Sequence, residues 1–181
     1  MVYCFFADGF EETEAIAPVD MLKRADVEVV TVGVGGEYIR GAHDISIKCD
    51  ITVDAVTLDD NLDGIILPGG MPGTLNLDAD ENVQKCIDFC ADNGKLISAI
   101  CAAPMIIGKK NLLDGKEAIC YPGFEEHLHG AVVSSKSVVI DGNFVTAKGA
   151  GVAVDFGLEL VAYLKDRETA DKIKAAIQCV L

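Results

Sequence analysis

The sequence predicts an α/β fold in which a mostly parallel sheet carries helices on both faces. Short apolar segments alternate along the chain with longer segments of helical periodicity. Short buried strands separated by helices are typical of parallel sheets whose two faces are both covered. Because no linker, repeat or low-complexity tract breaks this alternation, residues 1–181 are expected to form a single domain.

The first two predicted strands flank one helix. Val2–Ala7 is a short apolar run, and Val27–Val34 is a second run that is rich in valine. Apolar residues recur with helical spacing over Glu11–Ala25, and Pro18 is expected to bend or divide that helix. The turn Gly33-Val34-Gly35-Gly36 lacks the Gly-x-Gly-x-x-Gly spacing, so no dinucleotide cofactor is expected.

The middle of the chain repeats the pattern. Apolar and polar residues alternate over 45–49, which predicts a strand with one exposed face. Leu62–Leu67 predicts a buried strand that stops at Pro68-Gly69-Gly70. Asp80–Asn93 predicts a helix that Gly94 closes.

Cys101 lies where a strand is expected to pass into a helix. Leu96–Ile100 is an apolar run, and Ala102–Ile107 predicts a helix that ends at Gly108. A cysteine on such a sharp turn, a nucleophile elbow, faces the free N–H groups of the helix, whose partial positive charge favours the reactive thiolate. The same turn exposes the serine of a Gly-x-Ser-x-Gly motif, which this chain lacks. The alternative is a small buried apolar side chain, which describes most free cysteines.

The last part of the chain predicts strands, a hairpin and two closing helices. The turn signal at Asp141-Gly142-Asn143 joins two of these strands. The predicted elements are strands at Val132–Val133, Ser137–Ile140 and Phe144–Ala147, and helices at Gly151–Leu164 and Glu168–Val180.

Composition narrows the classes of function. The net charge of −14 argues against binding to nucleic acid or to an anionic membrane surface. No signal peptide is expected at the first residues, and no apolar run reaches membrane-spanning length. The seven cysteines form no Cys-x-x-Cys pair, so neither a disulfide framework nor a metal site is expected, and the expected compartment is the reducing cytoplasm. Cys86 and Cys90, four residues apart on a predicted helix, are expected in the core.

Residues with suggestive chemistry follow three of the predicted strands, and sites in such folds lie beyond the carboxyl ends of the strands. Glu14 follows the first of these strands. A carboxyl beside a thiolate tends to stay protonated, donates a hydrogen bond to the sulfur and can then shuttle a proton. The alternative is that Glu11, Glu12 and Glu14 only stabilise a helix N-terminus.

Backbone groups complete the predicted site. Gly69 and Gly70 let bare backbone approach a ligand, and the N–H groups of Gly70 and Ala102 together can form an oxyanion hole. A tight turn that needs glycine is the alternative, and both interpretations can hold together. The three histidines are expected in solvated loops rather than against Cys101: His43, His127 and His129.

Four motifs together resemble the ThiJ/PfpI superfamily, best the branch of the Parkinsonism-associated protein deglycase and its bacterial relatives. Asp8-Gly9-Phe10-Glu11-Glu12-Thr13-Glu14, Leu67-Pro68-Gly69-Gly70 and Ala99-Ile100-Cys101-Ala102-Ala103-Pro104 carry the resemblance. Lys148-Gly149-Ala150-Gly151 looks like the Arg-Gly-Pro-Gly turn of that branch. The resemblance runs in order over nearly the whole chain.

The resemblance implies a flavodoxin-like three-layer sandwich, a homodimer and no cofactor. It implies that Cys101 is the reactive, oxidisable cysteine, that Glu14 is its carboxyl partner, and that Gly70 and Ala102 are the backbone donors. It also implies stepwise oxidation of Cys101 to a sulfinate. Possible pocket residues are Gly69, Tyr121 and Lys148.

Three positions depart from relatives of this kind. Tyr121-Pro122 stands where some members carry a histidine before proline, so any role of that histidine as a base must pass to another group, and turnover can be low. The peptidase branch places a histidine directly after the cysteine, where this chain has Ala102, so a cysteine peptidase is not expected. Lys148 in place of arginine keeps the charge and loses the bidentate geometry.

The expected function is that of a cysteine-dependent glyoxalase or protein deglycase. The Cys101 thiolate adds to methylglyoxal or glyoxal, Glu14 moves the proton through an enediol, and water releases the hydroxy acid. The partners are then a small aldehyde or a glycated protein. The alternative is a redox sensor of oxidative stress, or a chaperone, in which Cys101 is oxidised and no aldehyde is turned over.

Overall fold

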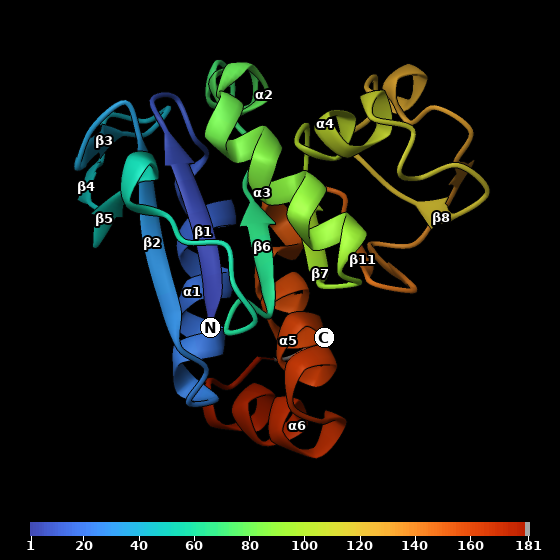
Figure 1. The fold of residues 1–181 in the computed structure, drawn as a ribbon. Coiled ribbons are helices and arrows are strands. Elements are labelled where there is room, and N and C mark those ends of the chain that lie inside the picture. Colours follow the sequence, from blue (N-terminus) through green and yellow to red (C-terminus); the bar gives the residue numbers. More distant parts are fainter. Residues whose placement is uncertain (180–181) are drawn as a thin grey trace.

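The computed structural model describes residues 1–179 and is built around a seven-stranded sheet (Figure 1). The strand order is β10-β11-β7-β6-β1-β2-β5, and all neighbours are parallel except the β10–β11 hairpin. The strands are β1 (Val2–Ala7), β2 (Val29–Val34), β5 (Ile51–Thr52), β6 (Gly64–Leu67), β7 (Leu96–Ile100), β10 (Val138–Asp141) and β11 (Phe144–Ala147). The expected α/β architecture, flavodoxin-like with a mostly parallel sheet, is therefore confirmed.

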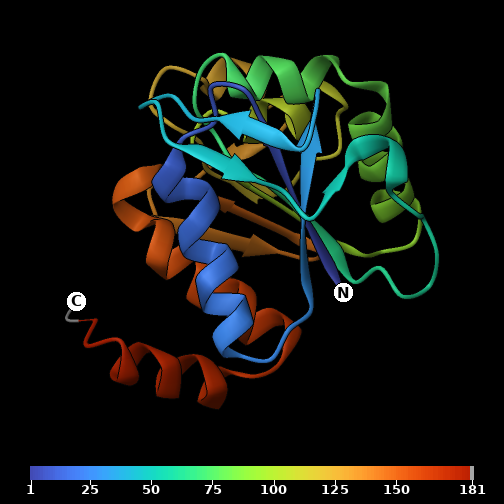
Figure 2. The same cartoon turned by 90° about the vertical axis from the view of Figure 1, so that its left-hand side faces the viewer.

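Helices cover both faces of the sheet, as the view along its edge shows (Figure 2). One face carries α1 (Glu12–Arg24), α5 (Ala153–Leu164) and α6 (Arg167–Ala176). The other carries α2 (Gly73–Ala79), α3 (Glu81–Asp92) and α4 (Pro104–Lys109). The sequence placed the last helix up to residue 180, which lies outside the described residues.

The alternation of side chains along the strands divides the interior into two cores. Along β1, Cys4 and Phe6 pack toward α1 and α5, whereas Tyr3 and Phe5 pack toward α2, α3 and α4. Both sets are buried, because each face of the sheet is covered by helices. The prediction that Cys86 and Cys90 lie in the core is confirmed, since both are buried on α3.

The sequence predicted the short elements only in part. The predicted strand over 45–49 is half of a small hairpin, β3 (Tyr38–Arg40) with β4 (Ser46–Lys48), and not part of the main sheet. A second small pair joins β8 (Glu117–Ala118) to β9 (Val132–Val133). The predicted strand at Val132–Val133 is confirmed, whereas β3 and β8 were not predicted, because elements of two or three residues carry little periodicity. The helix α2 also escaped prediction, because it follows Pro72 and begins at Gly73, both of which signal a turn.

Pro18 was expected to bend or divide the first helix, and the structure shows that it does not divide it. The helix α1 runs without interruption from Glu12 to Arg24. It is held by packing on α5, where Gly157 leaves room for the close approach: a Cβ at Gly157 would lie 2.9 Å from Pro18 Cα and 2.8 Å from Met21 Cγ. Tertiary packing therefore outweighs the one backbone hydrogen bond that Pro18 cannot make.

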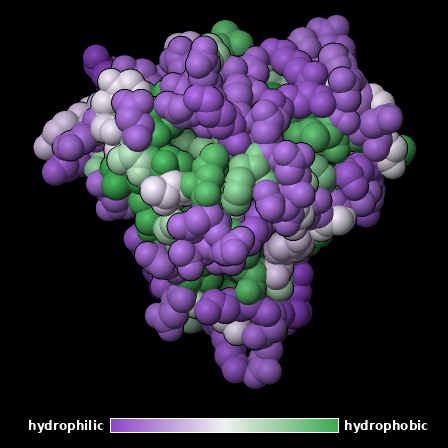
Figure 3. All heavy atoms as spheres, viewed as in Figure 1, coloured by the Kyte–Doolittle hydropathy of each residue, from purple (hydrophilic) through white to green (hydrophobic). Residues whose placement is uncertain are grey.

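Polar side chains dominate the face seen in Figure 1, with apolar groups scattered between them (Figure 3). None of the helices within residues 1–179 combines the length and the hydropathy needed to cross a bilayer.

Candidate active site

Cys101 lies in the sharp turn between β7 and α4, at the carboxyl edge of the sheet. Its φ of 64° is in the left-handed region, which a side chain with a Cβ adopts at a cost of about 1–2 kcal/mol. Backbone bonds fix this conformation on both sides: the Cys101 N–H donates to the carbonyl of Ala147 (2.9 Å), and the N–H of Tyr121 donates to the carbonyl of Cys101 (2.8 Å). Such an over-determined, strained residue is typical of a functional elbow.

Glu14 is brought to Cys101 by the start of α1. Glu11 caps this helix through a bond from the Glu14 N–H to its carboxylate (2.8 Å), so the first turn is fixed and Glu14 points inward. The Glu14 side chain is 1% exposed and hydrogen-bonds the Cys101 side chain. Its carboxylate also accepts from the N–H of Gly69 (3.1 Å) and from that of Ala150. Glu14 thus bonds to three segments that are distant in sequence.

The glycine turn after β6 closes the other side of the site. A Cβ at Gly69 would lie 2.5 Å from Glu14 Oε2 and 2.6 Å from Cys101 Cβ, so only glycine lets the two side chains meet here. The N–H groups of Gly70 and Ala102 both bond the sulfur of Cys101. Two backbone donors on one sulfur are an arrangement from which an oxyanion hole can be built.

Burial governs the ionisation of the pair. It raises the pKa of Glu14 to about 7, despite the hydrogen bonds that favour the carboxylate. Burial and then the nearby Glu14 carboxylate raise the pKa of Cys101 to about 12, against the hydrogen bonds from Ala102 and Gly70. The helix N–H groups lower the pKa of Cys101, in the direction expected from the sequence, but burial and the Glu14 carboxylate outweigh them.

One proton consequently connects the two side chains. With Glu14 ionised, Cys101 is a thiol that donates to the carboxylate. When that proton moves to Glu14, the repulsive charge disappears and the thiolate keeps the two backbone donors. The arrangement can therefore generate a nucleophile at the moment of attack without holding a free thiolate beforehand.

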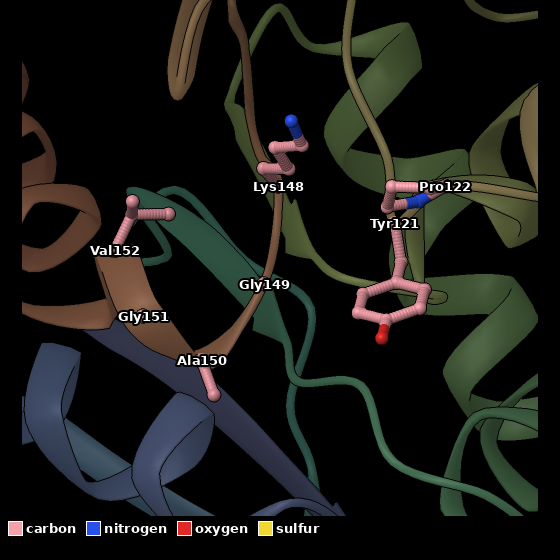
Figure 4. Close-up of a pocket in the computed structure, with 7 residues that line it drawn as sticks. All are labelled: Tyr121, Pro122, Lys148, Gly149, Ala150, Gly151 and Val152. Carbon is pink, nitrogen blue, oxygen red and sulfur yellow. The ribbon is translucent and has the colours of Figure 1, made fainter.

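A pocket of about 350 Å³ lies beside this pair, and Figure 4 draws the residues that line it. Gly149 connects the two, since a Cβ on it would lie 3.2 Å from Tyr121 Cδ2 and 3.9 Å from Glu14 Oε1. The Tyr121 side chain is half exposed at the pocket wall. The lining residues are Tyr121, Pro122, Lys148, Gly149, Ala150, Gly151 and Val152. Tyr121 and Lys148, named from sequence as possible pocket residues, both line it, whereas Gly69 lies between Glu14 and Cys101.

Among residues 1–179, no hydrogen bond joins a histidine to the Cys101 sulfur. His43 is exposed, but its ring is not simply solvated: Nδ1 lies 2.8 Å from Oε2 of the buried Glu12, and its backbone N–H donates to Oε1 of Glu12 (2.7 Å). Burial opposes the charge, yet the bonds from His43 hold the pKa of Glu12 below its usual value. This pair, which fixes the β3–β4 hairpin to α1, was not predicted from the sequence.

Glu11, Glu12 and His43 bring potential metal-ligand atoms within 4.8 Å of one another. Glu12 is already bonded to His43, and Glu11 is bonded to the first turn of α1. The contacts that this group makes within the chain account for it as a structural feature.

The role of Ala150 was missed by sequence reasoning. Its N–H bonds Glu14, and its side chain lines the pocket. An alanine that acts through its backbone has no signature of its own in a sequence. Glu14, Gly69, Gly70, Cys101 and Ala102, in contrast, are all brought together as the three strand ends suggested.

Comparison with known proteins identifies relatives across nearly the whole length. The model of the DJ-1/PfpI family matches residues 1–163. The chain is 34% identical over 170 residues to Protein dj-1beta of Drosophila melanogaster, covering 92% of this chain and 90% of that one. It is 32% identical over 164 residues to Deglycase PfpI of Pyrococcus furiosus, covering 88% and 96%. Oxidized DJ-1 of Toxoplasma gondii superposes with a TM-score of 0.94 at 31% identity, covering 99% of this chain and 98% of that chain.

Proposed function

This chain belongs to the DJ-1/PfpI family, and on that basis we propose that it is a cysteine-dependent enzyme that needs no cofactor and acts on small 2-oxoaldehydes or on their adducts with proteins. The observation that carries the proposal is the bond between the buried Glu14 carboxyl and the Cys101 sulfur, with the Gly70 and Ala102 N–H groups on the same sulfur. Two relatives, from Pyrococcus furiosus and Pyrococcus abyssi, are named deglycases. Methylglyoxal is the simplest substrate for this chemistry, and lactate is its product.

In the first step the sulfur of Cys101 attacks the aldehyde carbon. Glu14, as the carboxylate, accepts the thiol proton while the carbon–sulfur bond forms. The aldehyde oxygen becomes an oxyanion that the Gly70 and Ala102 N–H groups stabilise, and Glu14 returns the proton to it. The product is a hemithioacetal on Cys101, and Glu14 is again a carboxylate.

In the second step Glu14 moves a proton between the two substrate carbons. It removes the proton from the carbon bonded to sulfur, which gives an enediolate. The hydroxyl proton then passes to the neighbouring oxygen through the enediol, and Glu14 returns its proton to the neighbouring carbon. A thioester of Cys101 results, and water hydrolyses it to the hydroxy acid and the free thiol. No external oxidant or reductant takes part, because one carbon is oxidised as its neighbour is reduced. Glu14 carries out these proton transfers, because this chain has Tyr121 where some family members carry a histidine.

The test is lactate production from methylglyoxal without glutathione. Wild type should turn over methylglyoxal, and Cys101→Ser should lower kcat/KM by at least about a thousandfold, since the nucleophile is lost. Cys179→Ser, at a cysteine far along the chain from the elbow, is the matched control and should behave as wild type. Undiminished activity in Cys101→Ser would refute the mechanism.

A redox sensor of oxidative stress or a chaperone is the second candidate. The two backbone donors on the Cys101 sulfur favour it, because they also stabilise a sulfinate, and a relative of 31% identity is described as oxidized. Intact-mass spectrometry after mild peroxide decides: two oxygens on Cys101 with no aldehyde turnover would support the sensor. A cysteine peptidase is not proposed, since Ala102 stands where that branch carries histidine.

A further inference from the structure

The pocket beside Cys101 and Glu14 is lined mainly by apolar groups. Tyr121, Pro122, Ala150 and Val152 offer carbon surface to it. Lys148 lines it too, but Figure 4 shows its ammonium directed away from the Tyr121 hydroxyl. Such a lining stabilises an apolar group and offers few polar partners to a small hydrated aldehyde.

The pocket walls are tied to the reacting groups by short contacts. The Tyr121 N–H bonds the Cys101 carbonyl (2.8 Å), and the Ala150 N–H bonds the Glu14 carboxylate. Gly149 lies between the Tyr121 ring and Glu14 and has no side chain that would fill the space between them. A substrate whose aldehyde carbon reaches Cys101 can therefore extend its other end into the pocket.

The pocket has room for a larger group than methylglyoxal. At about 30 Å³ for each heavy atom, the share of a water molecule in the liquid, its five heavy atoms would fill less than half of the 350 Å³. The ten heavy atoms of phenylglyoxal would occupy about 300 Å³ on the same scale. An aromatic ring would also lie beside the ring of Tyr121, where aromatic pairs are favourable.

We infer that the site prefers 2-oxoaldehydes that carry a bulky apolar substituent over methylglyoxal, with the Tyr121–Val152 pocket as the specificity determinant. The inference rests on the proposed function for its chemistry. For phenylglyoxal the same internal proton transfer and hydrolysis consume one water and give mandelate, and the thiol of Cys101 is restored. The substituent takes no part in bond making, so its effect is on binding.

Gly151 allows the pocket to be filled without disturbing the reacting pair. It lines the pocket, a Cβ built on it has no neighbour within 4 Å, and its φ is not in the left-handed region. Gly151→Leu should therefore add carbon atoms to the pocket without a clash. Gly36→Leu is the matched control, because Gly36 also has open space around its Cβ and does not line the pocket.

The first measurement is kcat/KM for both aldehydes. Wild type should prefer phenylglyoxal by about tenfold or more, mainly through KM. Gly151→Leu should reduce this preference by about tenfold, and Gly36→Leu should leave it unchanged. Methylglyoxal turnover without a preference for phenylglyoxal, or an equal loss of both activities in Gly151→Leu, would overturn the inference while the proposed function stands.

A second measurement does not depend on turnover. Mandelate and lactate are compared as protectants of Cys101 against iodoacetamide, with peptide mass spectrometry as the readout. Mandelate should protect wild type at about a tenfold lower concentration than lactate, and Gly151→Leu should lose the difference. If neither aldehyde is turned over but mandelate protects selectively, the proposed function fails and the pocket preference holds. Equal protection by the two acids would refute the preference.

Discussion

At the scale of single residues, the buried Glu14 carboxylate lowers the stability of the fold and is also the base of the proposed reaction. Its carboxyl is buried among backbone donors and a thiol, and its pKa of about 7 lies well above its usual value of 4.5. As the base in the proposed mechanism, it must be ionised, which costs free energy in this environment. The group that drives the reaction therefore destabilises the fold at the pH where it works.

The pH dependence of stability should reveal this cost. Between pH 4.5 and 7 the folded protein keeps a proton that the unfolded chain releases, so the free energy of unfolding falls as pH rises, and the loss is complete above the folded pKa. The span corresponds to about 3 kcal/mol. Glu14→Gln removes this titration, so the stability of the variant relative to wild type should rise by up to about 3 kcal/mol over that interval.

Urea denaturation at a series of pH values measures this difference. Glu28→Gln, at an exposed glutamate, is the control and should give a curve parallel to that of wild type. A stability difference between wild type and Glu14→Gln that is constant from pH 4.5 to 8 would contradict the assignment of a raised pKa to Glu14.

Close packing between elements is what positions Glu14. The helix α1 carries Glu14 and Pro18 on one side of the sheet, and α5 follows the Lys148–Gly151 turn that lines the pocket. Gly157 lets these two helices approach until backbone meets backbone. The α1–α5 contact thus fixes the base and the pocket wall relative to each other.

Gly157→Val should separate the two helices. Its side chain would meet Pro18 Cα and Met21, and overpacking against backbone costs about 1–3 kcal/mol. Gly36→Val, where a Cβ meets no atom within 4 Å, should change stability by less than about 0.5 kcal/mol. Thermal and urea unfolding of the two variants measure this difference. Equal stabilities would show that α1 and α5 accommodate a side chain at position 157 and would contradict the close packing.

The sequence predicts the longer elements well because their patterns are local. The run Leu96–Ile100 is predicted with the bounds that β7 has in the structure, and the elbow at Cys101 follows from it. The strand β3 and the helix α2, which were not predicted, are short, and the β3–β4 hairpin depends on contacts with distant parts of the chain, such as the bond from His43 to Glu12. The pKa of Cys101 escaped prediction for the same reason: local helix N–H groups are visible in sequence, whereas burial and the approach of Glu14 are not.

At the scale of the whole molecule, we propose a homodimer on the basis of family membership. The chain has a mass of 19.2 kDa, so light scattering after size-exclusion chromatography should give twice that mass. Because the chain carries a net charge of −14, repulsion between subunits is strongest at low ionic strength, and the measurement should be repeated in low and in high salt. The mass of a single chain in both conditions would contradict a dimer.

The proposed roles of Cys101 as nucleophile and Glu14 as proton-transfer group are tested most directly by trapping the covalent intermediate. Glu14→Gln is mixed with methylglyoxal, quenched rapidly and analysed by intact-mass and peptide mass spectrometry. Thiols add to aldehydes without a catalyst, although more slowly than with Glu14 as the base, whereas the proton transfer between the two carbons needs a base. In Glu14→Gln one methylglyoxal should therefore still accumulate on Cys101 while lactate formation stops. Rapid lactate formation by Glu14→Gln, or an adduct on a residue other than Cys101, would contradict the proposed roles.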